Sequence, residues 1–177
     1  MNKPLQKQIF KMVARDQAMR FSGVWNAKID QKNTRALKAI IKKYGWPDID
    51  LVGKKAGQGA FLLAQHADND PKFQKLCLKL LTQKFEEHKV EPQSLAYLTD
   101  RVFVNFGKKQ IYGTQFYFNK KTKKFGPRPI KDLKNLSKRR YQKKLGSFQT
   151  YSKLLHQRQN TISNNLQAKK NFSIRIS

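Results

Sequence analysis

The sequence predicts an α+β fold that is predominantly helical: a compact helical domain, a small β-hairpin near residues 110–128 and a basic C-terminal extension. Up to about residue 107, hydrophobic residues recur mostly at helical spacing. A segment rich in β-branched and aromatic residues follows, and hydrophobic residues become sparse beyond about residue 160. Hydrophobic residues make up 38% of the chain and aromatic residues 11%, which is enough for a core. We therefore expect one globular domain over residues 1–155 and a basic, partly ordered tail over residues 156–177.

Three helices are expected in the first part of the chain. The first covers about residues 4–20, because Pro4 suits a first helical turn. The second covers residues 33–44, with Asn33 or Asp30 as its N-cap, and a turn-rich loop over residues 46–53 follows it. The third covers residues 54–67 and contains Gly57 and Gly59. Each glycine costs about 1 kcal/mol relative to alanine inside a helix. The pair therefore indicates either close packing against a neighbour or a helix start that lets a ligand approach the backbone.

Two more helices are expected before the hairpin and two after it. Asp70 followed by Pro71 is typical of an N-cap, so a helix should cover residues 70–89, with Cys77 as a buried thiol. Residues 91–107 fit a helix, although "RVFVNF" fits a strand equally well. Residues 131–146 fit a helix with a basic outer face, and residues 147–167 fit a weaker one.

The charge is high and unevenly distributed. The net charge is +27 and the isoelectric point is near 10.4. Residues 119–177 hold 17 basic residues and 1 acidic residue, against 21 and 10 in the longer preceding part. Such a charge favours nucleic acids, anionic membranes or phosphorylated ligands as partners, unless it only reflects a lysine-rich composition. The chain has no apolar run long enough for an integral membrane segment, so we expect a cytoplasmic protein, with delivery to another cell left open.

Three polar segments contain the candidate site residues. In "HADND", His66, Asp68 and Asp70 offer cation ligands, or a general base with an orienting carboxylate. Because Asp70 is explained as an N-cap and the remaining ligands are too few, we predict no metal site and assign no cofactor. In "LTDR", Arg101 fits a salt bridge to Asp68 or Asp100, a surface charge or a phosphate clamp. The residues of "QIYGTQ" fit either a polar ligand or a buried hydrogen-bond network.

These segments also resemble a known family. "GWP", "LVGKKAGQGAFLLAQHADNDPKFQ", "LAYLTDRVFVNFGKKQIYGTQF" and "RRY" are similar, in this order, to segments of a family of bacterial domains of unknown function. The resemblance covers roughly residues 5–150. It implies that the polar segments belong to one domain, and it brings no activity with it.

Two functions follow as hypotheses, and an enzymatic role is left open. In the first, a polar pocket binds or acts on an anionic, phosphate-bearing ligand. The catalytic candidates are His66, Asp68, Asp100 and Arg101, and the ligand-binding candidates are Gln65, Gln110, Tyr112, Thr114 and Gln115. In the alternative, the basic C-terminal third binds nucleic acid or another polyanion, and the polar clusters are only structural. The candidates for that role are Lys138, Arg139, Arg140, Tyr141, Lys143 and Lys144. No known nucleophile motif is present, and the sequence does not define the oligomeric state.

Overall fold

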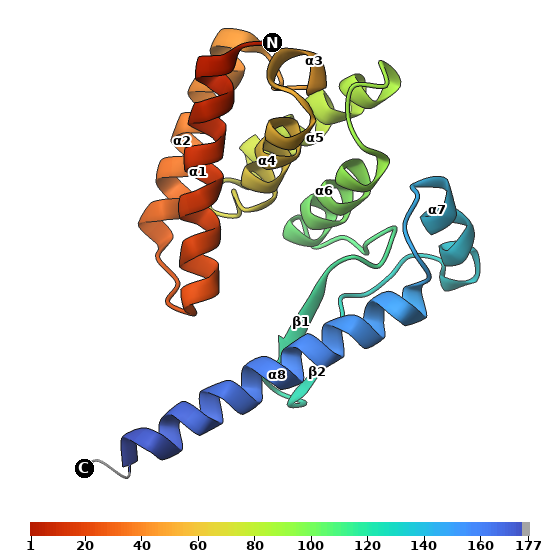
Figure 1. Cartoon of the computed structure of the whole chain (residues 1–177). Helices are drawn as coiled ribbons and strands as arrows, with labels where there is room; N and C mark the ends of the chain where they lie inside the picture. The colour runs from red at the N-terminus through yellow and green to blue at the C-terminus, as the bar shows by residue number, and fades with distance from the viewer. Residues whose placement is uncertain (175–177) are drawn as a thin grey trace.

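The fold is a helical bundle followed by a small hairpin and a long C-terminal helix (Figure 1). A computed structural model describes the backbone of residues 1–174 and the side chains of residues 1–162. The bundle consists of α1 (Lys3–Ser22), α2 (Ala27–Tyr44), α3 (Ile49–Val52), α4 (Lys54–Gln65), α5 (Pro71–Glu86) and α6 (Pro92–Asn105). After it come β1 (Phe116–Asn119), β2 (Lys124–Pro127), the 3-10 turn η1 (Leu133–Asn135), α7 (Leu136–Gln142) and α8 (Phe148–Ile174). The predicted α+β, predominantly helical class with a hairpin near residues 110–128 is confirmed.

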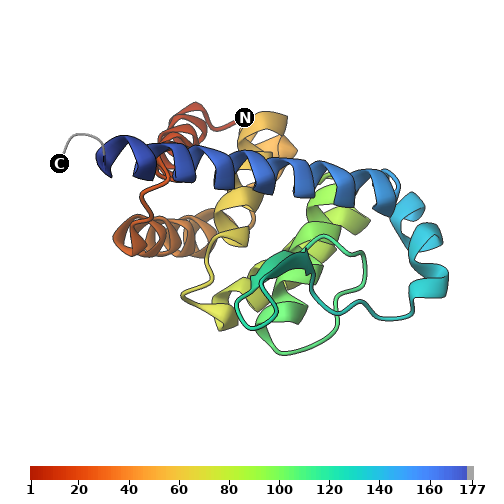
Figure 2. The same ribbon diagram turned by 90° about the horizontal axis from the view of Figure 1, so that it is seen from below.

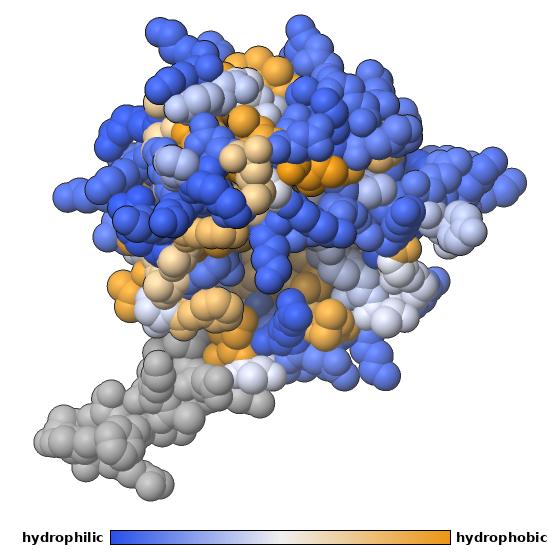
Figure 3. Space-filling view, turned by 45° about the horizontal axis from the view of Figure 1, so that its top comes forward, coloured by the Kyte–Doolittle hydropathy of each residue, from blue (hydrophilic) through white to orange (hydrophobic). Residues whose placement is uncertain are grey.

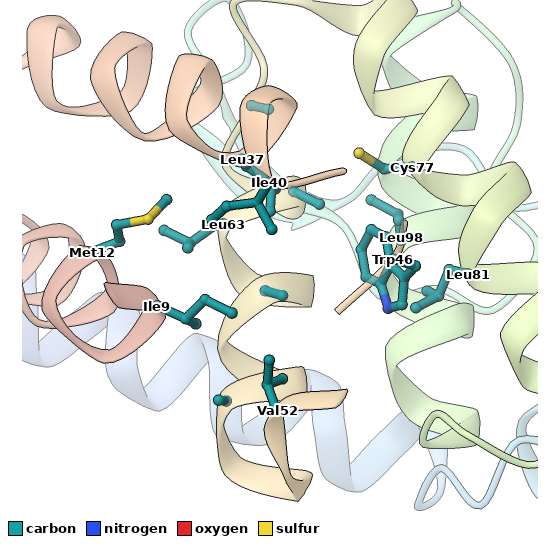
Figure 4. Packing of buried hydrophobic residues seen from close by; sticks show 14 of the residues in the cluster. Ile9, Met12, Leu37, Ile40, Trp46, Val52, Leu63, Cys77, Leu81 and Leu98 are labelled. Atoms are coloured by element: carbon teal, nitrogen blue, oxygen red, sulfur yellow. The ribbon is translucent and has the colours of Figure 1, made fainter. Parts of the chain in front are cut away.

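Helix α4 lies at the centre of the bundle and contacts α1, α2, α3, α5 and α6. The apolar stripes of these helices meet in one core, in which Ile9, Leu37, Leu63 and Leu98 are almost fully buried (Figure 4). Gly59 allows α1 to approach α4, because a Cβ atom at this position would lie 2.9 Å from the Cγ2 atom of Val13. The close-packing interpretation of this glycine therefore agrees with the structure.

The start of α2 differs from the prediction. The helix begins at Ala27, and the side chain of Asn26 accepts a hydrogen bond from the Lys28 N–H at 2.9 Å. Both predicted N-caps, Asp30 and Asn33, lie inside the helix, and the predicted start at residue 33 was six residues too late. A first turn that packs little apolar surface shows no hydrophobic periodicity, so the sequence pattern did not reveal it. The predicted loop over residues 46–53 also contains α3, because Asp48 accepts hydrogen bonds from the N–H groups of Asp50 and Leu51.

Helices α5 and α6 begin at Pro71 and Pro92, and the start at Pro71 agrees with the prediction. The Oδ1 atom of Asp70 accepts a hydrogen bond from the Phe73 N–H at 3.0 Å, which confirms Asp70 as the N-cap. The "RVFVNF" segment forms the end of α6, so its helical interpretation is correct. Cys77 is fully buried on α5, as expected.

The hairpin and the C-terminal helices follow the bundle. Strands β1 and β2 pair antiparallel, with Tyr117 opposite Gly126. The predicted helix over residues 131–146 is much shorter. At its start Asp132 has a φ of 47° and η1 precedes α7, and at its end Lys144 has a φ of 53° and the Leu145 N–H bonds back to the Arg140 carbonyl. Helix α8 is continuous across residue 156 and projects past the hairpin (Figure 2). The division into a domain and a tail stays a prediction, and residues 175–177 of that tail lie outside the described residues.

The face of the molecule drawn in Figure 3 is predominantly hydrophilic. On the face seen in Figure 3, hydrophobic residues lie as small areas among hydrophilic ones. Among residues 1–174, none of the helices combines the length and the apolar composition needed to cross a bilayer.

Candidate functional site

A pocket of about 590 Å³ opens at one end of the bundle, between the α1–α2 turn, the α4–α5 loop and α6. These segments lie at the lower side of the bundle in Figure 1. The lining residues are Arg20, Trp25, Ala27, Asp30, His66, Asp68, Asn69 and Arg101. His66, Asp68 and Arg101, which come from two of the predicted polar segments, therefore line one pocket. A small-molecule site commonly has about 300–1,000 Å³, so the size suits a metabolite.

His66 is held by a buried carboxylate on α1. It is the C-cap of α4, and its Nδ1 atom lies 2.9 Å and 3.0 Å from the two oxygens of Asp16. The Arg20 Nε atom lies 3.0 Å from the same Nδ1, which cannot both donate to Asp16 and accept from Arg20. The negative charge of Asp16 favours the tautomer in which Nδ1–H donates to the carboxylate. Nε2 is then the basic nitrogen, and among the described residues no side chain or backbone group bonds to it.

Asp16 remains ionised although it is fully buried. Burial raises the pKa of its carboxyl group, but the hydrogen bond and charge of His66 lower it more, together with Gln17 and Arg20. The net pKa is below the usual value, so the ionised carboxylate accepts a hydrogen bond from the ring and orients it.

A chain of polar contacts continues from this pair to the rim of the pocket. The Arg20 Nη2 atom lies 2.9 Å from Asp30 Oδ1 and 3.3 Å from Asp16 Oδ1. The Trp25 Nε1–H donates to Asp30 Oδ2 at 3.2 Å. The sequence interpretation missed Asp16, Arg20, Asp30, Trp25 and Asn69. One signal was available: Asp16 occupies a core position on the apolar stripe of α1, where a carboxylate needs a partner.

On the other side of the pocket, Arg101 forms a bidentate pair with Asp68. Arg101 Nε donates to Asp68 Oδ1 at 2.9 Å, and its Nη2 atom donates to Asp68 Oδ2. Its Nη1 atom donates to Gln115 Oε1 at 3.0 Å. Asp68 also accepts from Asn105 at 2.8 Å and from Gln74 at 3.1 Å. Burial raises the pKa of Asp68, but Arg101, Asn105 and Gln74 lower it more, so its pKa is below the usual value.

Asp100 belongs to a separate buried network and does not line the pocket. Its oxygens accept hydrogen bonds from the backbone N–H groups of Ile111, Tyr112 and Thr114 and from the Thr114 hydroxyl. Burial raises the pKa of its carboxyl group above the usual value, although these donors oppose the shift. The carboxylate shapes the loop after α6, so we leave it out of the proposed site.

The other ligand-binding candidates have mainly structural contacts. Gln110 is fully buried and bonds to both the N–H and the carbonyl of Gln115. Thr114 bonds to Asp100, and the contacts of Tyr112 in the network are made by its backbone. The carbonyl of Gln65 accepts from Gln74 at 2.9 Å, and its side chain is not part of the pocket lining. Gln115 alone connects the "QIYGTQ" segment to the pocket, through Arg101.

The basic candidates near α7 fall into two groups. Arg139 and Arg140 donate to backbone carbonyls, including those of Ile111 and Tyr112, and so attach α7 to the loop after α6. The Lys143 ammonium lies 3.9 Å from the centre of the Phe85 ring. The exposed members are Lys138, Tyr141 and Lys144. This region therefore offers fewer free basic groups to a polyanion than its sequence indicates.

The described residues contain no group of three or more His, Cys, Asp or Glu side chains placed to hold a metal ion. No curated protein and no solved structure matches the chain. One protein family does match: the model of the "Family of unknown function (DUF6624)" covers residues 4–161, which confirms the predicted membership in a family of unknown function. These residues are most of the chain and include the whole pocket, and the protein therefore belongs to the DUF6624 family.

Proposed function

We propose that the protein binds a small, phosphate-bearing anion in this pocket and that His66 transfers a proton there. The observation that carries the proposal is the pairing of His66 with the buried Asp16, which leaves Nε2 as a base at the wall of the pocket. An imidazole oriented by a carboxylate through Nδ1 is a common general acid and base. Asp16 is then a positioning residue, and His66 is the group that touches the ligand.

The charges of the pocket nearly balance, so the preference for an anion needs a separate argument. Arg101 is already paired with Asp68, but the two side chains are 31% and 41% exposed. An exposed ion pair contributes about 0–1 kcal/mol and a bidentate one more, so a phosphate group can displace Asp68 because it binds Arg101 in the same bidentate way. Asn105 and Gln74 still satisfy Asp68 after this exchange. The net charge of +27 adds a long-range attraction for anions.

The binding is tested by calorimetric titration with inorganic phosphate and with pyrophosphate at low ionic strength. Arg101→Gln removes the proposed phosphate contact, and a charge-assisted hydrogen bond contributes about 1.5–3 kcal/mol, so the Kd should rise at least about tenfold. Arg35→Gln is the matched control, because Arg35 is exposed and is not part of the pocket lining. The proposal fails if the wild-type protein binds neither anion at millimolar concentration, or if both variants weaken binding equally.

The proton transfer is tested with a panel of phosphate monoesters and diesters followed by phosphorus NMR. His66→Gln keeps a planar polar side chain but cannot exchange a proton, so turnover should fall by about 10²–10⁴ while anion binding stays within a few fold. His156→Gln is the control, since His156 is exposed and lies outside the pocket lining. Equal turnover in wild type and His66→Gln would remove His66 from the mechanism.

Polyanion binding is the second candidate function, and a groove between α1 and α2 favours it. The groove has a volume of about 660 Å³, and its lining contains Lys7, Lys11, Arg15 and Lys32 but no carboxylate. Three of these cations lie four residues apart on α1, so they share one face of the helix. The groove thus offers an anionic strand several adjacent positive charges.

This candidate is tested by fluorescence anisotropy with a labelled single-stranded RNA at several salt concentrations. Replacement of Lys7, Lys11 and Arg15 by Gln should weaken binding and reduce the salt slope by about one for each lost phosphate contact. The comparison variant replaces Lys138, Tyr141 and Lys144, the exposed group near α7. Affinity that stays constant with salt would contradict the electrostatic model, and His66→Ala should leave RNA binding unchanged.

A further inference from the structure

Trp25 is a large aromatic side chain at the rim of the pocket that the proton-transfer chemistry does not use. It lies in the turn between α1 and α2 and is 68% exposed, whereas Trp46, the other tryptophan, is 2% exposed. An exposed indole leaves a large apolar surface in water, so at the rim of a pocket it offers that surface to a ligand.

The edge of the indole is fixed in place. Its Nε1–H donates to Asp30 Oδ2 at 3.2 Å, and Asp30 Oδ1 in turn accepts from Arg20 at 2.9 Å. Asp30 is almost buried, so the anchor is itself held by the bundle. A ring that is held at its edge and exposed over most of its surface offers a flat apolar platform.

The platform and the proposed anion site belong to one continuous set of contacts. Arg20 bonds to Asp30 on the Trp25 side and lies 3.3 Å from Asp16, the partner of His66. Trp25, Arg20, His66 and Arg101 line the same pocket of about 590 Å³, which is large enough for a mononucleotide. A ligand with a phosphate near the arginines can therefore place a planar ring on the indole.

We propose that the ligand of this pocket is a nucleotide, whose base stacks on Trp25 while its phosphate contacts the arginines. The inference rests on the proposed function, because it names the class of ligand for the same site. Bases stack on aromatic side chains in proteins that bind single strands, and the interaction tolerates any base because every base has a π face. The pocket is thus expected to bind several nucleoside monophosphates with similar affinity.

Phe21 and Val24 are neighbours of Trp25 and are also exposed, at 86% and 73%, but they are not part of the pocket lining. If the three side chains formed only an apolar patch for a macromolecular partner, replacing any one of them would have the same effect on the Kd for a nucleotide. Under the stacking model only Trp25 matters. These two neighbours therefore provide matched controls.

The test is a fluorescence titration of the full chain with AMP, adenosine and inorganic phosphate. Because Trp46 is buried, saturable quenching by AMP reports on Trp25. Trp25→Leu should raise the Kd for AMP by about tenfold or more, measured by calorimetry, and change the Kd for phosphate less than about twofold. Trp25→Phe keeps a ring but loses the bond to Asp30, so it should retain most of the affinity if stacking is the cause.

The outcomes separate the inference from the proposed function. If phosphate binds through Arg101 but AMP binds no tighter than phosphate, or binds Trp25→Leu as well as wild type, the nucleotide inference fails and the anion site stands. If Phe21→Ala or Val24→Ala weakens AMP binding as much as Trp25→Leu does, stacking on one ring is refuted. If neither AMP nor phosphate binds, the proposed function fails and the inference fails with it.

Discussion

Replacement of Asp100 by alanine tests whether this residue builds the fold or belongs to a site. In the structure the carboxylate accepts hydrogen bonds at 2.6–3.2 Å from three backbone N–H groups and at 2.9 Å from a hydroxyl. Asp100→Ala removes the acceptor for all four donors. Because the residue is fully buried, water reaches these donors only if the loop over residues 110–114 opens.

The cost follows from the number of stranded donors. An unsatisfied buried donor costs about 1–3 kcal/mol, and partial solvation of the opened loop returns some of this. We expect Asp100→Ala to lower the free energy of unfolding by about 3–6 kcal/mol, out of the 5–15 kcal/mol that is usual for a domain. For a chain of this length, about 2–4 °C in Tm corresponds to 1 kcal/mol, so the Tm should fall by about 6–24 °C.

Urea unfolding followed by circular dichroism measures this loss. Asp50→Ala is the matched control, because Asp50 is 66% exposed and its ion pair with Lys89 lies at the surface. Asp50→Ala should leave the unfolding midpoint almost unchanged. A Tm loss below about 2 °C for Asp100→Ala would refute the structural role, because one stranded donor alone would exceed it. Loss of phosphate binding with the stability intact would restore Asp100 to the site.

Three further predictions concern packing, pH and the thiol. Gly59→Ala should lower the free energy of unfolding in urea by about 1–3 kcal/mol, because its Cβ atom would crowd α1. Gly57→Ala should instead raise it by up to about 1 kcal/mol, because a Cβ atom there has its nearest contact, the Pro47 carbonyl oxygen, at 3.4 Å. The pKa values of Asp16 and Asp68 are lowered in the folded state. The stability that these carboxylates contribute is therefore complete above about pH 4 and is lost as the pH falls through the lowered pKa values. In Asp16→Asn, the free energy of unfolding should depend less steeply on pH in this acidic range. Burial raises the pKa of Cys77 to about 12, so mass spectrometry should find no alkylation by iodoacetamide in the folded protein and full alkylation in denaturant.

The elements that could be predicted are those that local rules specify. Hydrophobic periodicity predicts most of the helices because each one buries a single face against α4 or its neighbours. The cap at Asp70 and the hairpin follow from residue types over a few positions. Hydrophobic periodicity failed where the chain conformation depends on other features. The first turn of α2 depends on its N-cap, and the end of the helical segment after residue 142 depends on the left-handed backbone conformation of Lys144.

The site was predictable only in part, because its halves come from distant segments. His66, Asp68 and Arg101 were candidates for their residue types, and the structure places all three in one pocket. The pairing of His66 with Asp16 spans 50 residues, and no local pattern encodes it. In the same way, nothing in "LTDR" separates Asp100 from Arg101, although the two side chains point to different networks.

The two buried carboxylates, Asp16 and Asp100, differ in the groups that donate hydrogen bonds to them. The donors to Asp100 come from one loop, and most are backbone groups that cannot leave it. The donors to Asp16 are side chains of His66, Arg20 and Gln17, and Arg20 is 28% exposed and keeps Asp30 as a second partner.

Removal of one partner of a buried ion pair is costly when the other charge stays buried without a partner, but Arg20 is partly exposed and keeps Asp30 when Asp16 is replaced. Asp16→Leu should therefore cost less free energy of unfolding than Asp100→Leu, which strands four donors. The two variants are compared in the same urea titration. An equal loss would mean that Asp16 supports the fold as Asp100 does. A smaller loss at Asp16 leaves the orientation of His66 as the reason for burying a charge there.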